Sequence, residues 1–422
     1  MLALLSLAGV CTRLCLLLQA PLYLGYAVAA RDFLSFQWDN LLIECLVLAA
    51  CLPRRQVAPV RHALLRLLLF KLYFESGIAK AQSVLGDWLD GSAMSFYYET
   101  APLPTWPAWF LHQLPESWHR LESFGALGLE TVAALLILGP RRARLAALVA
   151  FTGFQILNFA TASYGFFVPL ALALHVFLLD ERDALKMTAW LRSIWPSRIA
   201  APAMLLWRAV RRAARRAVPR PRLQALSPAW QRRASRGVFV LGSLWLAVSL
   251  VTAVAHFAPP GRLADSAANA VRPVSAFRVA NAYHLFGHIT RERIEPELQS
   301  FDGATWQPHF LRYKPGDVQV APPFVAPHQP RVDFLLWFHG LDFERGLPRY
   351  AVRLLERVCT APDEVQPLFA AALPRTPAAV RIVYWQYHFA TPEERRATGA
   401  WWRRSKVAAT TPLDCATLLR GP

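Results

Sequence analysis

The chain has 422 residues with 46 Lys and Arg against 28 Asp and Glu, which gives a formal net charge of +18. Yet 55% of the residues are hydrophobic, only 18% are charged, and the mean hydropathy is +0.27. Fifteen Trp and 25 Phe supply enough apolar surface to exclude a disordered chain. The low charged fraction argues against a soluble nucleic-acid-binding protein, so the composition favours a membrane protein.

Apolar runs of membrane-spanning length follow one another along the chain. A run of about 20 residues, at about 1.5 Å per residue, crosses a hydrocarbon core of roughly 30 Å. The predicted spans are 14–30, 41–52, 63–79, 121–139, 143–160, 163–179 and 237–258, of which 41–52 is short. We therefore expect a multi-span helical membrane domain over 1–179 and a last span at 237–258.

The positive charges lie on alternate segments between these spans. Arginines follow the second and fourth spans, and segment 180–236 carries 14 basic and 3 acidic residues, a net +11. Lys and Arg near span ends mark the cytoplasmic side. Segment 180–236 is then a basic cytoplasmic loop, whereas loop 80–120 and residues 259–422 are extracytoplasmic. The cytoplasmic loop is expected to touch anionic lipid headgroups.

The N-terminal residues allow two interpretations. Residues 1–10 are apolar with no cation before Arg13, so we expect them to be the end of a helix whose beginning is missing. The alternative is a signal peptide cleaved after Ala27-Val28-Ala29, which the lack of an early cation and the further apolar spans disfavour.

The six cysteines divide by location. Cys11, Cys15, Cys45 and Cys51 lie in or near spans, where cysteine is usually a small packing residue. Cys359 and Cys415 lie in the extracytoplasmic part, where a disulfide is chemically permitted but not required by the sequence. No zinc-binding spacing occurs, so no metal site is predicted.

A cluster of polar residues lies in and just after the third predicted span. Lys71 and Glu75 are four residues apart, share a helix face and could neutralise each other. Lys80, Asp87 and Trp88 follow within a few residues. A structural ion pair is the favoured interpretation, and a polar cavity is the alternative.

Loop 80–120 carries further candidates for function. Its prolines predict an extended loop rather than helices, and a structureless segment of this length suggests function. Tyr97, Tyr98 and the nearby tryptophans are expected to be interfacial anchors. The candidate site residues here are Tyr97, Tyr98, Glu99, His112 and His119, with Glu122 nearby; their spacing matches no metal template.

The segment 259–422 is long enough for an independent domain. Runs 294–300 and 306–313 flank Asp302-Gly303, which predicts a β-hairpin, and 380–389 is a further predicted strand. Residues 348–358 have the apolar spacing of a short amphipathic helix. We expect a β-rich extracytoplasmic domain with one or two helices, a sandwich being one arrangement.

Three groups in this domain are candidates for contact with other molecules. His284 and His288 have the spacing of two ligands on one helix face, but without a third ligand we expect no metal. His328, Arg331 and Asp333 lie in a loop fixed by prolines; they form either a client-recognition cluster or an internally hydrogen-bonded knot. Trp401 and Trp402 could contact a client or the lipid surface.

Several motifs resemble, in order, those of the lipase maturation factor family. They are DFLSFQWD at 32–39, FKLYFESGIAK at 70–80, GDW at 86–88, YYETAPLP at 97–104, YKPGD at 313–317, APHQPRVD at 326–333 and GAWW at 399–402. The resemblance implies a polytopic protein that assists secreted lipases to reach their folded, active dimers, in the endoplasmic reticulum membrane of animals. Family members have further membrane sequence before the position of Met1.

The richness in Arg and Ala suggests a bacterial source, so we expect an inner-membrane location, secreted client proteins and membrane lipids as partners, and no nucleic acid. The client itself is not implied by the family in that setting.

A more distant resemblance concerns the membrane part. Residues 77–91 and 161–167 are similar to segments of the vitamin-K-dependent gamma-carboxylase, in which the lysine matching Lys80 acts as a base. The alternative function is therefore a membrane-embedded enzyme on a lipid, quinone or protein substrate, with Lys80 as base. Its spacing to Asp87-Trp88 is longer here, which disfavours that interpretation. No nucleophile elbow, Walker loop or dinucleotide fingerprint occurs, so no cofactor is predicted, and a transporter is disfavoured because no repeat of spans is visible.

Overall fold

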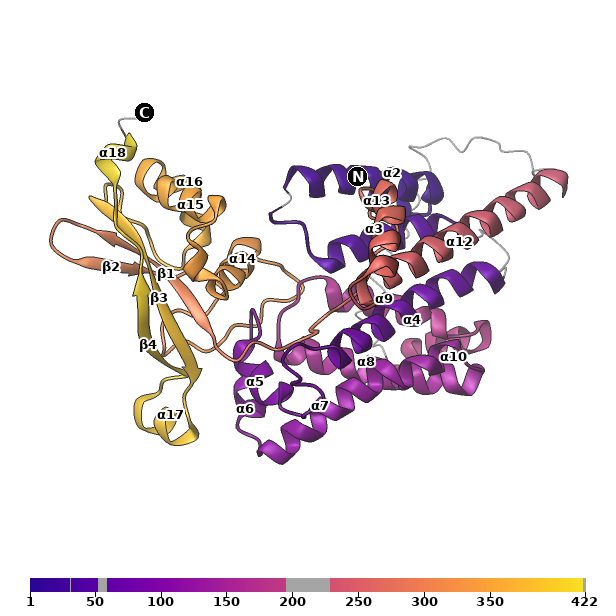
Figure 1. Ribbon diagram of the computed structural model, residues 1–422, viewed down its shortest axis with the longest axis horizontal. Coiled ribbons are helices and arrows are strands. Elements are labelled where there is room, and N and C mark those ends of the chain that lie inside the picture. The colour runs from indigo at the N-terminus through magenta and orange to yellow at the C-terminus, as the bar shows by residue number, and fades with distance from the viewer. Residues whose placement is uncertain (31, 52–58, 195–227, 420–422) are drawn as a thin grey trace. The chain divides into compact units, whose positions relative to one another are not determined.

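The computed structural model describes residues 1–30, 32–51, 59–194 and 228–419 (Figure 1). They form two compact units. The first comprises 1–82, 128–152 and 170–287, and the second comprises 83–127, 153–169 and 288–422. The arginine-rich run 208–222 and the predicted basic turn at Arg54 and Arg55 lie outside the described residues.

The first unit is helical (Figure 1). Its helices are α1 (Leu2–Leu7), α2 (Thr12–Ala29), α3 (Gln37–Ala50), α4 (Pro59–Ala81), η1 (Ala133–Leu138), η2 (Val176–Leu178), α10 (Glu181–Ile194), α12 (Pro228–Phe257) and α13 (Arg262–Ser275). Three helices have residues in both units: α7 (Glu116–Thr131), α8 (Arg141–Thr161) and α9 (Phe167–His175).

Four described helices are long and apolar enough to cross a membrane: Thr12–Ala29, Glu116–Leu138, Arg141–Thr161 and Arg236–Phe257. They correspond to four of the seven predicted spans. Of the others, α3 has 14 residues and Phe167–Leu178 is a shorter apolar helix. Helix α4 has 23 residues, but charged side chains interrupt its apolar sequence. Helix α3 and the helix Phe167–Leu178 are shorter than the other spans, and α4 carries charged side chains that need polar partners.

The prediction of an extended loop over 80–120 was wrong. The segment contains α5 (Ala93–Thr100), α6 (Trp106–His112) and the start of α7. Pro107 lies in the first turn of α6, where the missing N–H would have no intrahelical partner, and Pro115 directly precedes α7. These two prolines therefore mark helix starts, whereas Pro102 and Pro104 lie in the non-helical residues between α5 and α6.

The second unit contains one antiparallel sheet in the described residues. Its strands are β1 (Ile294–Phe301), β2 (Trp306–His309), β3 (Ala379–Phe389), β4 (Trp402–Ala409) and β5 (Leu413–Asp414). The order is β2-β1-β3-β4, and β5 pairs with β3. The hairpin at Asp302 and the strand at 380–389 are confirmed, with Asp302 accepting main-chain hydrogen bonds from Ala304 and Thr305. A single sheet replaces the sandwich considered above.

Helices cover one face of this sheet (Figure 1). They are α14 (Arg331–Gly340), η3 (Phe343–Arg345), α15 (Arg349–Thr360), α16 (Pro362–Val365), η4 (Gln366–Leu368) and α18 (Cys415–Leu419), while α17 (Pro392–Thr398) lies between β3 and β4 in the sequence. Leu354, Leu355 and Val358 of α15 share a core with Leu298 and Ile382 of the strands. The amphipathic helix expected at 348–358 is thus confirmed.

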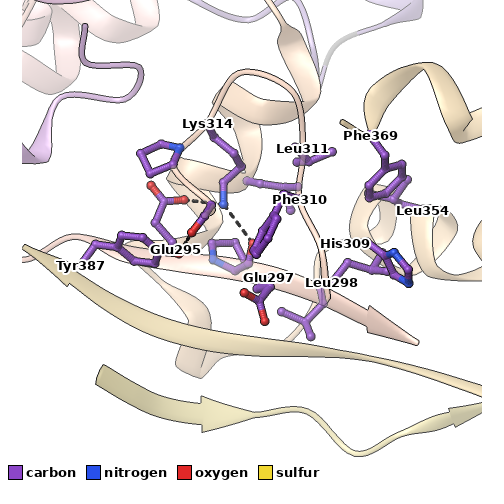
Figure 2. A pocket seen from close by; sticks show the side chains of 15 residues that line it. Glu295, Glu297, Leu298, His309, Phe310, Leu311, Lys314, Leu354, Phe369 and Tyr387 are labelled. Carbon is purple, nitrogen blue, oxygen red and sulfur yellow. Dashed lines mark hydrogen bonds and ion pairs between the residues drawn. The ribbon is translucent and has the colours of Figure 1, made fainter. Parts of the chain in front are cut away.

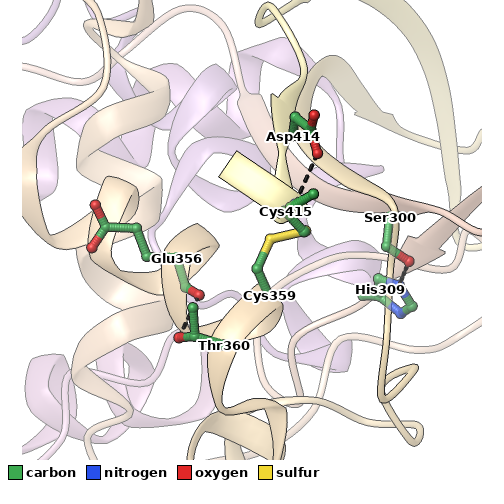
Figure 3. The surroundings of a disulfide bond; sticks show 8 residues. Ser300, His309, Glu356, Cys359, Thr360, Asp414 and Cys415 are labelled. Carbon is green, nitrogen blue, oxygen red and sulfur yellow. Dashed lines mark hydrogen bonds between the residues drawn. A yellow bond between two sulfur atoms is a disulfide. The ribbon is translucent and has the colours of Figure 1, made fainter. Parts of the chain in front are cut away.

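A disulfide closes this layer. The sulfurs of Cys359 in α15 and Cys415 in α18 are bonded, with Cα atoms 5.3 Å apart (Figure 3). The remaining cysteines, Cys11, Cys15, Cys45 and Cys51, are not in a disulfide and belong to the first unit. The disulfide-bonded cysteines therefore lie in the second unit, and the cysteines outside a disulfide lie in the first.

Candidate functional site

Helix α4 carries part of the predicted polar cluster. Lys71, Glu75, Ser76 and Lys80 are all buried, although they are spread around half of the helix circumference. They bind main-chain atoms of segment 281–285. Lys71 donates to the carbonyl of Asn281, Glu75 accepts from the N–H of Tyr283 (2.8 Å), Ser76 accepts from the N–H of Leu285 (3.3 Å), and Lys80 donates to the carbonyl of Leu285 (2.8 Å). Main-chain atoms of every second residue, 281, 283 and 285, are thus bound by side chains of α4, as at the edge of a β-strand.

Glu44 of α3 is the carboxylate at the centre of this network. It is fully buried and accepts hydrogen bonds from Trp245 (2.9 Å), Asn281 (2.9 Å) and the hydroxyl of Tyr283 (2.7 Å). Its Oε1 lies 3.7 Å from Nζ of Lys71. We expected Lys71 to pair with Glu75. The ion pair is with Glu44 instead, on a helix that sequence spacing along α4 could not reveal.

Lys80 has its own carboxylate. Its side chain is buried, and Nζ lies 2.5 Å from Oε2 of Glu130, which is also buried. Gly77 makes this approach possible, because a Cβ there would lie 2.7 Å from the carbonyl carbon of Glu130. Lys80 is therefore held in a buried ion pair, which favours the structural interpretation of this lysine.

Asp87 and Trp88 belong to the second unit, so the predicted cluster of five is divided between the units. Asp87 is fully buried and accepts from the N–H of Ile289 (2.7 Å) and from the hydroxyl of Ser83. The Trp88 side chain is buried as well. Asp87 thus connects the segment after α4 with the segment that leads into β1.

A buried arginine that sequence analysis missed organises the second unit. Arg293 is 0% exposed and donates to the carbonyls of Glu99 (2.8 Å), Ala101 (2.5 Å) and Pro102 (3.0 Å). It also pairs with Glu295 at 2.6 Å, and Lys314 is the second cation on that carboxylate. The charges at 293, 295 and 297 were visible in the sequence, but charge at every second residue is typical of a solvated strand face, so the pattern did not indicate burial.

Two indoles make further hydrogen bonds to main-chain carbonyls. Trp337 donates to the carbonyl of Thr100 (3.0 Å), and Trp109 donates to the carbonyl of Ala390 (2.8 Å). Tyr97 and Tyr98 are buried rather than exposed. The prediction of interfacial anchoring is therefore wrong for these two tyrosines. Residues 97–104 comprise the buried end of α5 and the buried connection towards α6.

Glu99 brings two histidines together. Its carboxylate accepts from Nδ1 of His388 (2.9 Å) and from the N–H of Phe389 (2.6 Å), and Nε2 of His112 lies 3.7 Å away. Burial acts to raise the pKa of Glu99, but these hydrogen bonds outweigh it and the pKa is lowered. The hydrogen bond to Glu99 raises the pKa of His388, whereas burial lowers the pKa of His112.

His119 makes a separate set of contacts. Its Nδ1 lies 3.2 Å from Glu122, which also accepts from the hydroxyl of Tyr98 at 2.8 Å, and its Nε2 lies 3.3 Å from the carbonyl of His112. Across the described ranges, no group of three or more His, Cys, Asp or Glu is placed to hold a metal ion. The pair His284 and His288 is likewise not on a helix.

Of the five candidate client-recognition residues, Asp333 and Trp402 are buried, whereas His328 is exposed and Arg331 and Trp401 are partly exposed. Asp333 is buried and accepts from the N–H groups of Tyr313 (3.0 Å) and Lys314 (3.1 Å); burial raises its pKa. The ring of His328 contacts Tyr313. Trp402 is 1% exposed and stacks on Phe389, so it offers no surface, whereas Trp401 is partly exposed. For Asp333 the hydrogen-bonded-knot interpretation fits.

A small pocket adjoins β1 in the second unit (Figure 2). Glu295, Glu297, Lys314 and Tyr387 line one part, and Leu298, Leu311, Leu354 and Phe369 are among the apolar residues that line the rest. Its free volume of about 20 Å³ is close to the minimum that a water molecule needs. In this conformation it cannot take an organic cofactor or substrate.

These observations describe a multi-helix membrane protein with a sheet-bearing unit whose buried carboxylates accept hydrogen bonds or form ion pairs. Residues 1–186 match the family described as "Lipase maturation factor transmembrane domain", and residues 279–412 match the "Lipase maturation factor C-terminal domain". The chain belongs to the lipase maturation factor family, as the motifs at 32–39, 70–80 and 97–104 indicated.

Individual relatives agree with this assignment. Lipase maturation factor 2 of Homo sapiens is 29% identical, over 97% of this chain and 72% of the relative. Lipase maturation factor 2 of Gallus gallus is also 29% identical, over 92% of this chain and 66% of the relative. Lipase maturation factor 1 of Mus musculus is 26% identical, over 93% and 68%. No solved structure matches the chain.

Proposed function

We propose that this protein is a membrane-anchored maturation factor for secreted proteins, that its clients are lipases, and that it acts through its second unit. The observation that carries the proposal is the match of the chain to both domains of the family, since the relatives are named for lipase maturation. Membrane lipids are its other partner, and no nucleic acid takes part. No cofactor is required in this account.

The second unit is proposed to lie outside the cytoplasm. Its disulfide, Cys359–Cys415, needs an oxidising compartment, whereas the cysteines outside a disulfide belong to the first unit. Arg141 and Arg144 at the start of α8 support the same orientation through the positive-inside rule. For a bacterial source, the membrane is the inner membrane, and for animal relatives it is the endoplasmic reticulum membrane.

The enzymatic alternative receives little support from Lys80, because the Glu130 carboxylate contacts its ammonium group. A maturation factor of this kind instead needs a stable extracytoplasmic surface. Arg293, the Glu99 carboxylate and the disulfide give the second unit that rigidity. We place client contact on its exposed residues, among them Phe338 and Val407, with Trp401, His328 and Arg331 as further candidates.

The test is site-specific photo-crosslinking in intact cells. A benzoylphenylalanine is placed in the full chain at Phe338 or Val407, which are 43% and 45% exposed, and at Leu185 of the first unit, 64% exposed, as the matched control. We expect the secreted lipase of the same cells to crosslink from 338 or 407 and not from 185. A crosslink from 185 alone, or none at all with a lipase being secreted, contradicts the proposal.

A further inference from the structure

Two exposed aromatic rings of α6 and the partly exposed Trp401, which precedes β4, form one continuous patch in the second unit. Trp106 and Phe110 are four residues apart on α6, 49% and 47% exposed, with ring centroids 6.0 Å apart. Trp401 lies 6.3 Å from Phe110 and 5.7 Å from the buried Trp109. We call Trp106, Phe110, Trp401 and Arg395 the aromatic patch. Exposed rings of this size, grouped rather than scattered, indicate a binding surface.

Arg395 supplies the charge of the patch. Its guanidinium carbon lies 3.6 Å from the ring centroid of Trp401, 4.5 Å from Trp109 and 5.6 Å from Phe110. Its neighbours are neutralised: Arg396 pairs with Glu393, and Arg403 lies 3.5 Å from Glu394. Within the part of the chain that the structure describes, no carboxylate pairs with Arg395. An arginine stacked on indoles keeps its N–H groups for an anion such as phosphate.

The chain itself holds this patch close to the bilayer. Helix α6 ends at His112 and α7 begins at Glu116, which is the first residue of the candidate membrane span Glu116–Leu138. The connecting residues 113–115 reach only about 10 Å when fully extended. In the first turns of α7, Trp118, Leu121 and Phe124 are exposed as well. An exposed aromatic surface so close to a span end stands at the height of the lipid headgroups.

We propose that the aromatic patch is a membrane-docking surface: Trp106 and Phe110 enter the headgroup layer, and Arg395 binds lipid phosphate groups. Trp and Tyr side chains prefer this layer because their rings are apolar while their N–H or O–H groups remain hydrated. The sheet-bearing unit is then held at the bilayer by α17 and the turn before β4, in addition to its covalent connection. A lipid occupant fits the position and the unpaired cation better than a polypeptide does.

Depth-dependent quenching tests this docking in the full chain. Cys11, Cys15, Cys45 and Cys51 are replaced by Ala, and an NBD fluorophore is attached to Trp106→Cys in nanodiscs of phosphatidylcholine with phosphatidylglycerol. Glu344→Cys, at an exposed position of η3, is the matched control and Leu121→Cys the lipid-facing reference. We expect a headgroup-proximal nitroxide lipid to quench the label at 106 about twofold more than the label at 344.

Arginine variants isolate the phosphate contact. We expect quenching at 106 to be stronger with phosphatidylglycerol than in phosphatidylcholine alone, to lose that gain in Arg395→Gln, and to keep it in Arg396→Gln. Equal melting temperatures verify that both variants fold. A label at 106 that only aqueous iodide quenches overturns the proposal. So does protection that appears only when a lipase precursor is added, which would assign the patch to the client, and so does a gain that survives Arg395→Gln.

Discussion

Nζ of Lys80 lies 2.5 Å from Oε2 of Glu130, and both side chains are buried. This contact joins α4 to the end of α7 across 50 residues of sequence. It also assigns the lysine, which is the residue most open to a catalytic interpretation, to a structural ion pair. Variants that remove one charge or both charges of this pair therefore distinguish a catalytic role of Lys80 from a structural one.

The first prediction is a double-mutant cycle at this pair. Lys80→Met leaves the carboxylate of Glu130 buried without its cation, which costs about 3 kcal/mol of folding free energy. Lys80→Met combined with Glu130→Gln removes both charges and should recover most of that loss, together with client maturation. The measurements are the thermal unfolding of the detergent-solubilised protein and the activity of the secreted lipase.

One result of the double-mutant cycle would contradict the structural interpretation of Lys80. If the double variant folds like the original chain but supports no maturation, Lys80 has a chemical role that its ion pair does not explain. Glu116→Gln serves as the control for loss of an acid, because this carboxylate is exposed and pairs only with an exposed arginine.

The second prediction concerns Arg293. Arg293→Met leaves the carbonyls of Glu99, Ala101 and Pro102 without their donor and leaves Glu295 with Lys314 as its cation. We expect a loss of about 3 to 5 kcal/mol and rapid proteolysis of the second unit. Arg396→Met removes an arginine that is 75% exposed and should change stability by less than about 0.5 kcal/mol. Equal protease resistance of the two variants would refute the role of Arg293.

Much of the architecture was predictable because it depends on local patterns. The hairpin at Asp302, the strand at 380–389 and the helix at 349–360 follow from turn chemistry and apolar spacing. The helices within 93–120 were missed because the prolines were taken as breakers, whereas Pro107 and Pro115 stand where helices begin.

The partners of buried charges were not predictable. Lys71 contacts Glu44, Lys80 contacts Glu130 and Glu99 contacts His388, in each case across more than 25 residues. Sequence spacing reports neighbours on one helix, and these contacts arise from tertiary packing. The alternating charges at 293, 295 and 297 were visible, but only the fold reveals that Arg293 faces main-chain carbonyls rather than water.

The third prediction concerns the disulfide. Cys359 and Cys415 are 56 residues apart in sequence, and closure of a loop of this length stabilises the fold by about 4 kcal/mol. Cys359→Ser with Cys415→Ser should lower the urea midpoint of the second unit, whereas Cys51→Ser, which removes a cysteine outside any disulfide, should not. Alkylation in intact cells followed by mass spectrometry should find 359 and 415 unmodified before reduction. Free thiols there would contradict both the bond and the extracytoplasmic location.

The fourth prediction is the pH dependence of the Glu99 cluster. Because the Glu99 hydrogen bond raises the pKa of His388, its stabilising effect is complete below the ordinary His pKa of 6.5 and is lost as pH rises through the higher folded value. Burial lowers the pKa of His112, so its effect has the opposite sign: stability falls as pH drops below 6.5. Glu99 itself, with a lowered pKa, loses its contribution only under stronger acid.

Two variants distinguish these opposing effects. Relative to the original chain, His388→Gln should lose more stability at about pH 5.5 than at about pH 8.5, whereas His112→Gln should lose less at the lower pH. The groups that face His388 are Glu99, Arg403 and Glu292, and those that face His112 are Glu99, His119 and His388. Melting temperatures that shift in parallel for the two variants would contradict the assignment.

Whether the chain matures secreted lipases is decided by the lipase activity per lipase molecule. The gene is deleted in its host, and the secreted lipase is quantified both by mass and by turnover of a soluble ester. We expect a several-fold lower activity per molecule, restored by the full chain and by the Lys80→Met, Glu130→Gln double variant. Unchanged activity per molecule after deletion would refute the proposed function.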